Sequence, residues 1–183
     1  IKCLFKMLNS IAILGRPNVG KSSLFNKLTK SRNAIVSDFS GLTKDRNFGF
    51  ATFKDHQYLV IDTGGVGSEI TEFSAAITEQ ALIAAKDSNL ILFLVDASEE
   101  LTSDDIDLFQ SIRKMNKNFF VVLNKIDIKK RSNAKADLLN LGCGDILEIS
   151  AEHSHGIKEL KTYISKQFIE PNNSDSEDPQ GTK

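Results

Sequence analysis

Apolar residues along the chain fall into short blocks, separated by longer stretches in which apolar positions recur at helical spacing. Residues 89–95 and 119–123 are almost continuously apolar and strand-sized, as in parallel strands covered on both faces. Strands are predicted at 11–14, 46–53, 57–62, 89–95, 119–123 and 145–149, with a polar turn at 54–56. Helices are predicted in the stretch that holds Leu24, Phe25 and Leu28, then at 70–86, from Ser103, at 133–141 and at 156–169. The pattern predicts an α/β fold with about six strands, mostly parallel, with one antiparallel hairpin strand and helices on both faces.

A glycine-rich loop joins the first predicted strand to the first predicted helix. It fits the pattern G-x-x-x-x-G-K-[ST] with the residues Gly15-Arg16-Pro17-Asn18-Val19-Gly20-Lys21-Ser22. Glycines let backbone N–H groups turn toward a phosphate oxygen, and the helix that follows points its positive end at the same place. Lys21 can reach the β- and γ-phosphates, and the Ser22 hydroxyl is placed to ligate Mg²⁺. A chance glycine-rich turn is the alternative, but the strand–loop–helix setting favours a nucleoside triphosphate site.

Two further loops fall where a γ-phosphate and its metal ion would lie. The run Asp62-Thr63-Gly64-Gly65 follows a predicted strand. Asp62 can hold Mg²⁺, usually through water, and the Gly65 amide can meet the γ-phosphate. Thr43 could be a second hydroxyl ligand for Mg²⁺ that senses the γ-phosphate. Taken alone, the first run is as well explained by a plain turn and Thr43 by a polar loop; their order after the phosphate loop favours the site.

The loops that follow the last two predicted strands predict recognition of guanine. The run Asn124-Lys125-Ile126-Asp127 follows a buried strand. The Asp127 carboxylate can accept both N1–H and the exocyclic N2–H₂ of guanine, and the Lys125 stem can lie over the base. In the run Ser150-Ala151-Glu152, the Ala151 backbone amide would meet the guanine O6. A polar strand exit is the alternative for each loop, and the phosphate loop upstream favours the guanine site.

The composition argues against some classes of partner and location but indicates no further chemistry. The formal net charge is −1, so there is no global basic signature for nucleic acid, and Cys3 and Cys143 have neither metal-ligand nor disulfide spacing. The apolar runs are strand-sized and the first residues do not resemble a secretory signal, so we expect a cytoplasmic location and no membrane partner. Met7 suggests that residues 1–6 lie upstream of the true start. Residues 171–183 are polar and acidic, as in a flexible linker toward a missing part of the protein.

The ordered set of motifs resembles the translation-factor-related GTPases, and within them the Der (EngA) family of ribosome-assembly GTPases. The resemblance covers about residues 9–169 and depends on GLTKDR (41–46), on DTGG (62–65), on SAEH followed by GI, and on the run LFLVDASEELTSDD. Departures are Lys44, where the family usually has Arg, and Ser154-His155 before Gly156. The resemblance implies a P-loop NTPase with a Ras-like G domain at 9–169. It also implies an N-terminal extension at 1–8 and an acidic linker at 170–183, which leads to a second G domain and a KH-like domain.

The resemblance further implies a GTP-hydrolysing switch that acts in biogenesis of the large ribosomal subunit, contacting that subunit and its rRNA through the full-length protein. The implied catalytic residues are Lys21, Asn18, Thr43 and Gly65. Mg²⁺ would be held by Ser22, Thr43 and Asp62, and K⁺ by Asn18. The implied GTP and GDP contacts are Gly15, Arg16, Pro17, Asn18, Val19, Gly20, Lys21, Ser22, Ser23, Asp62, Thr63, Gly64, Gly65, Asn124, Lys125, Asp127, Ser150, Ala151 and Glu152.

The sequence is compatible with more than one way of catalysing the hydrolysis of GTP. Val66 stands where Ras-like enzymes have the Gln that orients the attacking water. Arg16 or Arg46 could instead serve as an internal arginine finger, although an exposed loop arginine is more often simply solvated. A binding module that barely hydrolyses GTP stays open for the same reason. Another bacterial GTPase, such as a tRNA-modification GTPase, is a further alternative, against which the DTGG loop and the acidic linker argue.

Overall fold

The computed structural model describes residues 9–29, 47–63, 82–129 and 132–169 of the 183-residue chain. These residues contain a six-stranded sheet in the order β2-β3-β1-β4-β5-β6, in which β2 runs antiparallel to β3 and the other neighbours are parallel. The strands are β1 (Asn9–Leu14), β2 (Asn47–Phe53), β3 (His56–Asp62), β4 (Leu90–Asp96), β5 (Phe119–Asn124) and β6 (Ile146–Glu148). The helices are α2 (Lys21–Thr29), α4 (Ser103–Lys114), α5 (Ala134–Asn140) and α6 (Ile157–Ile169), and residues 82–87 are also helical. The predicted α/β fold is confirmed.

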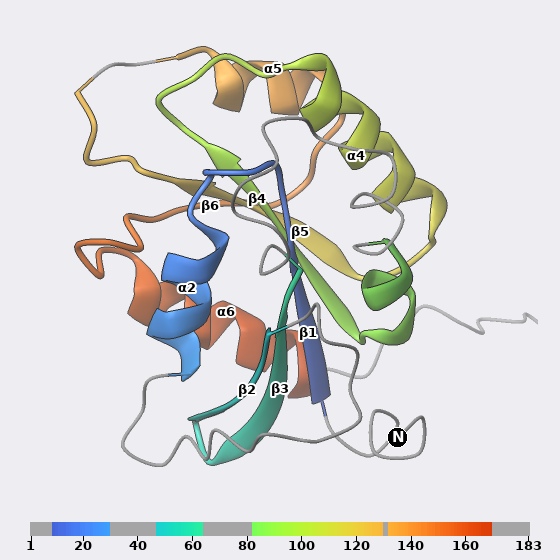
Figure 1. The fold of residues 1–183 in the computed structure, drawn as a ribbon, viewed down its shortest axis with the longest axis vertical. Helices are drawn as coiled ribbons and strands as arrows, with labels where there is room; N and C mark the ends of the chain where they lie inside the picture. The colour runs from blue at the N-terminus through green and yellow to red at the C-terminus, as the bar shows by residue number, and fades with distance from the viewer. Residues whose placement is uncertain (1–8, 30–46, 64–81, 130–131, 170–183) are drawn as a thin grey trace, which may run out of the picture.

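Helices cover both faces of the sheet, and each face has its own core. All seven residues of β4 are buried, and they alternate between the two sides. Leu90, Leu92 and Leu94 pack with α2 and α6, whereas Ile91 and Phe93 pack with α4 and α5. Figure 1 shows the same division, with α2 and α6 together on one side and α4 and α5 on the other. Burial on both faces explains why this strand is apolar at nearly every position.

The hairpin turn is one residue shorter than the sequence predicts. Lys54 and Asp55 both have positive φ, 51° and 63°, as in the type I′ turn whose twist matches that of two antiparallel strands. His56 therefore pairs with Phe53 as the first residue of β3 rather than belonging to the turn. Of the helix predicted at 70–86, residues 82–86 are helical and the rest lies outside the described residues.

Helix α4 begins at Ser103, as predicted, and its first turn is closed by a capping box. The Thr102 hydroxyl accepts from the Asp105 amide, while the Asp105 carboxylate accepts from the Thr102 amide at 3.1 Å. Asp104 and Asp105 both lie in this first turn, where carboxylates suit the helix dipole. Asp105 does more than that, because its side chain is buried and lies on the inner side of the helix.

Candidate nucleotide-binding site

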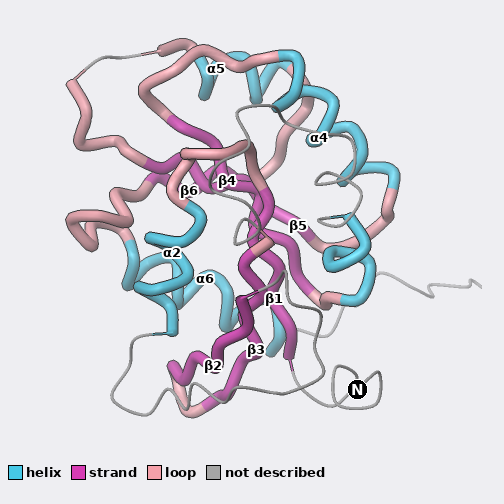
Figure 2. Tube along the Cα trace, viewed as in Figure 1, coloured by secondary structure: helices cyan, strands magenta, loops and turns pink. Residues whose placement is uncertain are grey.

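The loops that carry the predicted motifs gather at one edge of the sheet. Strands β1, β3, β4 and β5 are parallel, so their carboxyl ends lie at the same edge. Figure 2 shows the loops that leave this edge lying close together, next to the start of α2. Ligands of open parallel sheets bind at this edge, so the fold places the motifs where a nucleotide would be held.

The phosphate loop passes so close to the ends of two strands that side chains do not fit at its glycines. A Cβ on Gly15 would lie 2.3 Å from the Leu94 carbonyl oxygen of β4. A Cβ on Gly20 would lie 2.2 Å from Asn124 Nδ2, and Gly20 also has φ 98°, a conformation that side chains disfavour. The glycines of the motif are therefore required by close packing as well as by backbone shape.

Lys21, the first residue of α2, is turned back onto its own loop. Its ammonium donates to the carbonyl oxygens of Gly15 at 2.8 Å and Arg16 at 2.6 Å, and the residue is 8% exposed. Burial lowers the pKa of Lys21 to about 8; the charge of Asp62 opposes this shift, and the charge of Arg16 adds to it. Lys21 therefore loses its proton at a pH closer to neutral than an ordinary lysine does.

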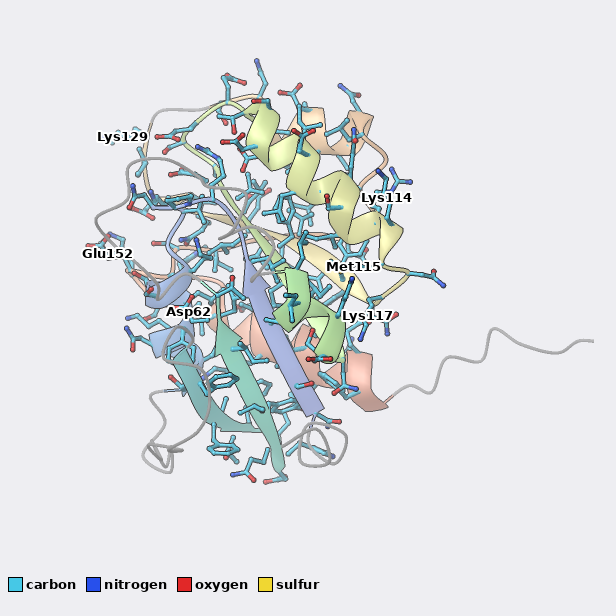
Figure 3. The ribbon with its side chains drawn as sticks, turned by 45° about the vertical axis from the view of Figure 1, so that its right-hand side comes forward. Asp62, Lys114, Met115, Lys117, Lys129 and Glu152 are labelled. Carbon is cyan, nitrogen blue, oxygen red and sulfur yellow. The ribbon has the colours of Figure 1, made fainter. Side chains whose placement is uncertain are left out.

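Two predicted Mg²⁺ ligands already lie together. The Ser22 hydroxyl donates to Asp62 Oδ2 at 2.9 Å, which joins the start of α2 to the end of β3. Thr63 is anchored beside them, because its hydroxyl donates to the Ile13 carbonyl oxygen at 2.7 Å. A hydroxyl and a carboxylate at the N-terminus of a helix are oxygen donors of the kind that Mg²⁺ prefers, so this pair fits the ion. In Figure 3, Asp62 lies near α2 in the middle of the molecule.

Asn124 joins the phosphate loop to the guanine-recognition loops. It is 2% exposed, its Nδ2 donates to the Val19 carbonyl oxygen at 2.9 Å, and its Oδ1 accepts from the Ala151 amide at 2.9 Å. The sequence predicts that the Ala151 amide meets the guanine O6, whereas here that amide is engaged by Asn124. One side chain therefore fixes the distance between the two ends of the site.

Lys125 forms an ion pair with Asp96, which was not among the predicted site residues. Its ammonium lies 2.6 Å from Asp96 Oδ2, at the end of β4, and Asp96 is 3% exposed. Asp96 Oδ1 accepts from both the amide and the hydroxyl of Ser98. Burial would raise the pKa of Asp96, but the hydrogen bonds from Lys125 and Ser98 outweigh it and hold the pKa below its usual range. The position of an acid directly after a buried parallel strand was the signal in the sequence that could have revealed this residue.

Asp127 is open to solvent at the outer edge of the site. A hydrogen bond from the Ser150 side chain lowers the pKa of Asp127, and the neighbouring His153, whose Nε2 lies 3.5 Å away, acts in the same direction. Ser150 and His155 exchange two backbone hydrogen bonds that close the loop. Glu152 is exposed, and Figure 3 places it at the periphery. The acid predicted to read the base is therefore ionised and accessible.

Of the remaining predicted residues, the structure describes some and not others. Asn18 is exposed and has φ 64°, a left-handed conformation that asparagine tolerates better than most residues. Pro17 and Ser23 are also exposed. Thr43, Gly64, Gly65, Val66 and Arg46 lie outside the described residues. Within the described part of the chain, no three His, Cys, Asp or Glu residues form a metal-binding group.

Comparison with known proteins identifies the class. The family described as "50S ribosome-binding GTPase" matches residues 10–125, which contain the phosphate loop, Asp62 and the start of the guanine-recognition motif. The chain belongs to this family of GTPases. Within it, the recognised resemblance to Der is confirmed: the chain is 43% identical over 166 residues to the GTPase Der of Pseudoalteromonas atlantica. That match covers 88% of this chain but 34% of the relative, so the chain spans about a third of the length of the Der protein it matches.

Solved structures agree on the fold. Era of Aquifex aeolicus, solved as a single-residue variant bound to GDP·AlF₄⁻, superposes with a TM-score of 0.68 at 30% identity, covering 93% of this chain and 60% of that one. The G domain of the FeoB iron transporter of Thermotoga maritima superposes with a TM-score of 0.66 at 26% identity, covering 88% of this chain and 99% of that one. Within the described ranges, no helix combines the length and apolarity needed to cross a bilayer.

Proposed function

We propose that this chain is a G domain that binds GTP and GDP with Mg²⁺ and hydrolyses GTP. The observation that carries the proposal is the Asn124 side chain, which hydrogen-bonds the phosphate loop through Val19 and the base loop through Ala151. Two loops held at a fixed spacing suit a ligand with a phosphate chain at one end and a base at the other. The match to a GTPase family supports the same reading.

Each end of the site has a defined task in this proposal. Lys21 leaves the carbonyl oxygens of its own loop and donates to the β- and γ-phosphates. Ser22 and Asp62 would hold Mg²⁺, together with Thr43, and the ion would neutralise charge on the phosphate oxygens. At the other end, Asp127 accepts from the guanine N1–H and N2–H₂ groups, and the Lys125 stem covers the base from its anchor on Asp96.

The exchange Asp127→Asn tests the base assignment. It replaces an acceptor with an amide, so guanine loses two hydrogen bonds and meets a donor; we expect a loss of about 2–4 kcal/mol in affinity for GDP. Xanthine carries an oxygen at C2 that can accept from the new amide, so the variant should gain affinity for xanthosine diphosphate. Fluorescence titration with both nucleotides measures the switch.

Asp107→Asn is the matched control, because it makes the same chemical change at an exposed position of α4, outside the loops of the site. It should leave the preference for guanine intact. Normal GDP affinity in the Asp127→Asn chain would show that the guanine assignment is wrong.

The finer proposal is that K⁺ activates hydrolysis through the Asn18 side chain. With Val66 at the position of the usual glutamine, a monovalent cation could supply the missing charge stabilisation. The left-handed φ of 64° supports a second candidate, in which Asn18 serves only as a turn residue. Asn18→Gly separates them, since glycine keeps the backbone conformation and removes the side-chain oxygen. A ligand role predicts loss of the rate difference between K⁺ and Na⁺ with GDP binding retained; a turn role predicts that this difference persists.

At the level of the whole protein, we propose that this G domain precedes a second G domain and a KH-like domain and acts in the cytoplasm during biogenesis of the large ribosomal subunit. Two findings support this: the chain covers 34% of the Der relative, and its family is described as ribosome-binding. Co-sedimentation of the full-length protein with purified large subunits, in GDP and in a non-hydrolysable GTP analogue, is the test. Absence of co-sedimentation in both nucleotide states would contradict the ribosomal role.

A further inference from the structure

Arg16 crosses from the phosphate loop to the helix on the opposite face of the sheet. The backbone of the loop continues into α2, which lies on the other side of the sheet from α4 (Figure 1). The Arg16 side chain instead reaches Asp105 in the first turn of α4. Its Nε lies 2.7 Å from Asp105 Oδ2, and its Nη2 lies 3.3 Å from Glu99 Oε2. The loop is therefore tied to helices on both faces of the sheet.

The contact between Arg16 and Asp105 is an ion pair between a partly exposed guanidinium and a buried carboxylate. The two side chains are 17% and 1% exposed. Asp105 Oδ1 and Arg16 Nε make no well-aligned hydrogen bond to any described residue, so charge attraction rather than hydrogen-bond geometry holds the pair. Removing Arg16 is destabilising, because it leaves the buried carboxylate of Asp105 without its counter-charge. The guanidinium charge is thus committed to α4 instead of being free to meet a ligand.

The phosphate loop is held at two points on either side of its exposed tip. Arg16 fixes the first point to α4, and the Val19 carbonyl oxygen fixes the second to Asn124 of β5. Pro17 and Asn18, which lie between these points, are exposed. The backbone carbonyl oxygen of Arg16 also accepts from the Lys21 ammonium at 2.6 Å. A shift at residue 16 would therefore move both the loop and the lysine.

We propose that Arg16 is a positioning residue: its ion pair with Asp105 holds the phosphate loop in the shape that receives the phosphates, and Arg16 is not an arginine finger. The proposal rests on the proposed function of guanine-nucleotide binding. Preorganised backbone amides raise affinity because the loop need not be ordered on binding. The effect is expected in nucleotide affinity, since Arg16 acts equally on the bound diphosphate and triphosphate.

The test compares four variants of the 183-residue chain: Arg16→Met, Asp105→Asn, the double variant and Glu99→Gln. Asp105→Asn removes the charge but keeps an acceptor for the Thr102 amide, so α4 retains its cap. Titration with fluorescent GDP gives the dissociation constant, GTP hydrolysis gives kcat and KM, and thermal melting reports folding. Glu99→Gln is the matched control, because Glu99 contacts the same arginine from an exposed position.

We expect Arg16→Met and Asp105→Asn each to raise the dissociation constant for GDP about tenfold, with kcat changed less than about threefold. Glu99→Gln should stay within about twofold of the unchanged chain. The double variant should bind GDP no more weakly than either single variant, because both remove the same contact. Its melting temperature should exceed that of Arg16→Met, since no unpaired carboxylate is left buried.

Three results would overturn the proposal. A large fall in kcat for Arg16→Met with none for Asp105→Asn would make Arg16 an arginine finger. Additive losses in the double variant would mean that the two residues act separately. Unchanged GDP affinity in a folded Asp105→Asn variant would show that the ion pair stabilises the fold but does not contribute to GDP binding. Failure of the unchanged chain to bind GDP would instead refute the proposed function, so the two ideas fail in distinguishable ways.

Discussion

Replacing Asn124 with alanine should weaken both the fold and the nucleotide site. The side chain is 2% exposed and makes one hydrogen bond to the Val19 carbonyl oxygen and one to the Ala151 amide, each at 2.9 Å. Val19 and Ala151 are each 1% exposed, so water does not readily replace the lost partner. Asn124→Ala therefore leaves a buried donor and a buried acceptor unpaired on two different loops.

The expected size follows from those two groups. A buried polar group left without a partner costs about 1–3 kcal/mol, so the two together, with the small cavity left by the amide, should lower the free energy of unfolding by about 3–5 kcal/mol. GDP affinity should fall at least about tenfold, or ~1.4 kcal/mol, because the spacing of the two loops is no longer fixed. Asn124→Asp keeps the acceptor for Ala151 but turns a carboxylate oxygen toward the Val19 carbonyl, so it should destabilise at least as much.

Urea unfolding followed by circular dichroism measures the first effect, and titration with fluorescent GDP measures the second. Asn118→Ala is the control, since Asn118 is exposed just before β5 and its replacement should change stability by less than about 0.5 kcal/mol. A loss below about 1 kcal/mol for Asn124→Ala, or unchanged GDP affinity, would refute the reasoning that this side chain links the two loops.

Three further predictions concern the same edge of the sheet. Gly20→Ala would push a methyl group against Asn124 Nδ2 and should lower GDP affinity at least about tenfold by titration; normal binding would contradict the packing described. Lys21 has its pKa lowered to about 8 in the free protein and a bound polyphosphate raises it, so the complex takes up a proton. GDP affinity should therefore fall about fourfold from pH 7 to 8.5, and a flat profile would refute this. Asp96→Asn removes the counter-charge of Lys125, so GDP should dissociate about five- to tenfold faster in stopped flow. An unchanged rate would show that the ion pair between Lys125 and Asp96 does not support nucleotide binding.

The fold was predictable because its signals are local. Strand β4 is apolar at almost every residue since both its faces are covered, and the start of α4 carries the Thr102–Asp105 capping pattern within four residues. The phosphate loop was equally visible, because its glycines must stand at fixed places. Each of these features can be read within a short window of sequence.

Pairings between distant segments left no such signal. Arg16 meets Asp105 from 89 positions away, and nothing in the local pattern of either residue distinguishes this ion pair from two solvated charges. Lys125 finds Asp96 in the same way. The engagement of the Ala151 amide by Asn124 also depends on the register of β5 and β6, which only the assembled sheet defines.

The strand order has a consequence for synthesis on the ribosome. β1 is the earliest of the described strands to be made, yet it lies between β3 and β4, so neither of its edges is paired until residues 56–62 and 90–96 have been translated. At roughly 5–20 residues per second, β1 waits about 4–16 s for its second neighbour, with an apolar surface that chaperones would recognise. Asn124 emerges later still. The link from Val19 through Asn124 to Ala151 therefore cannot form until residue 151 has been translated.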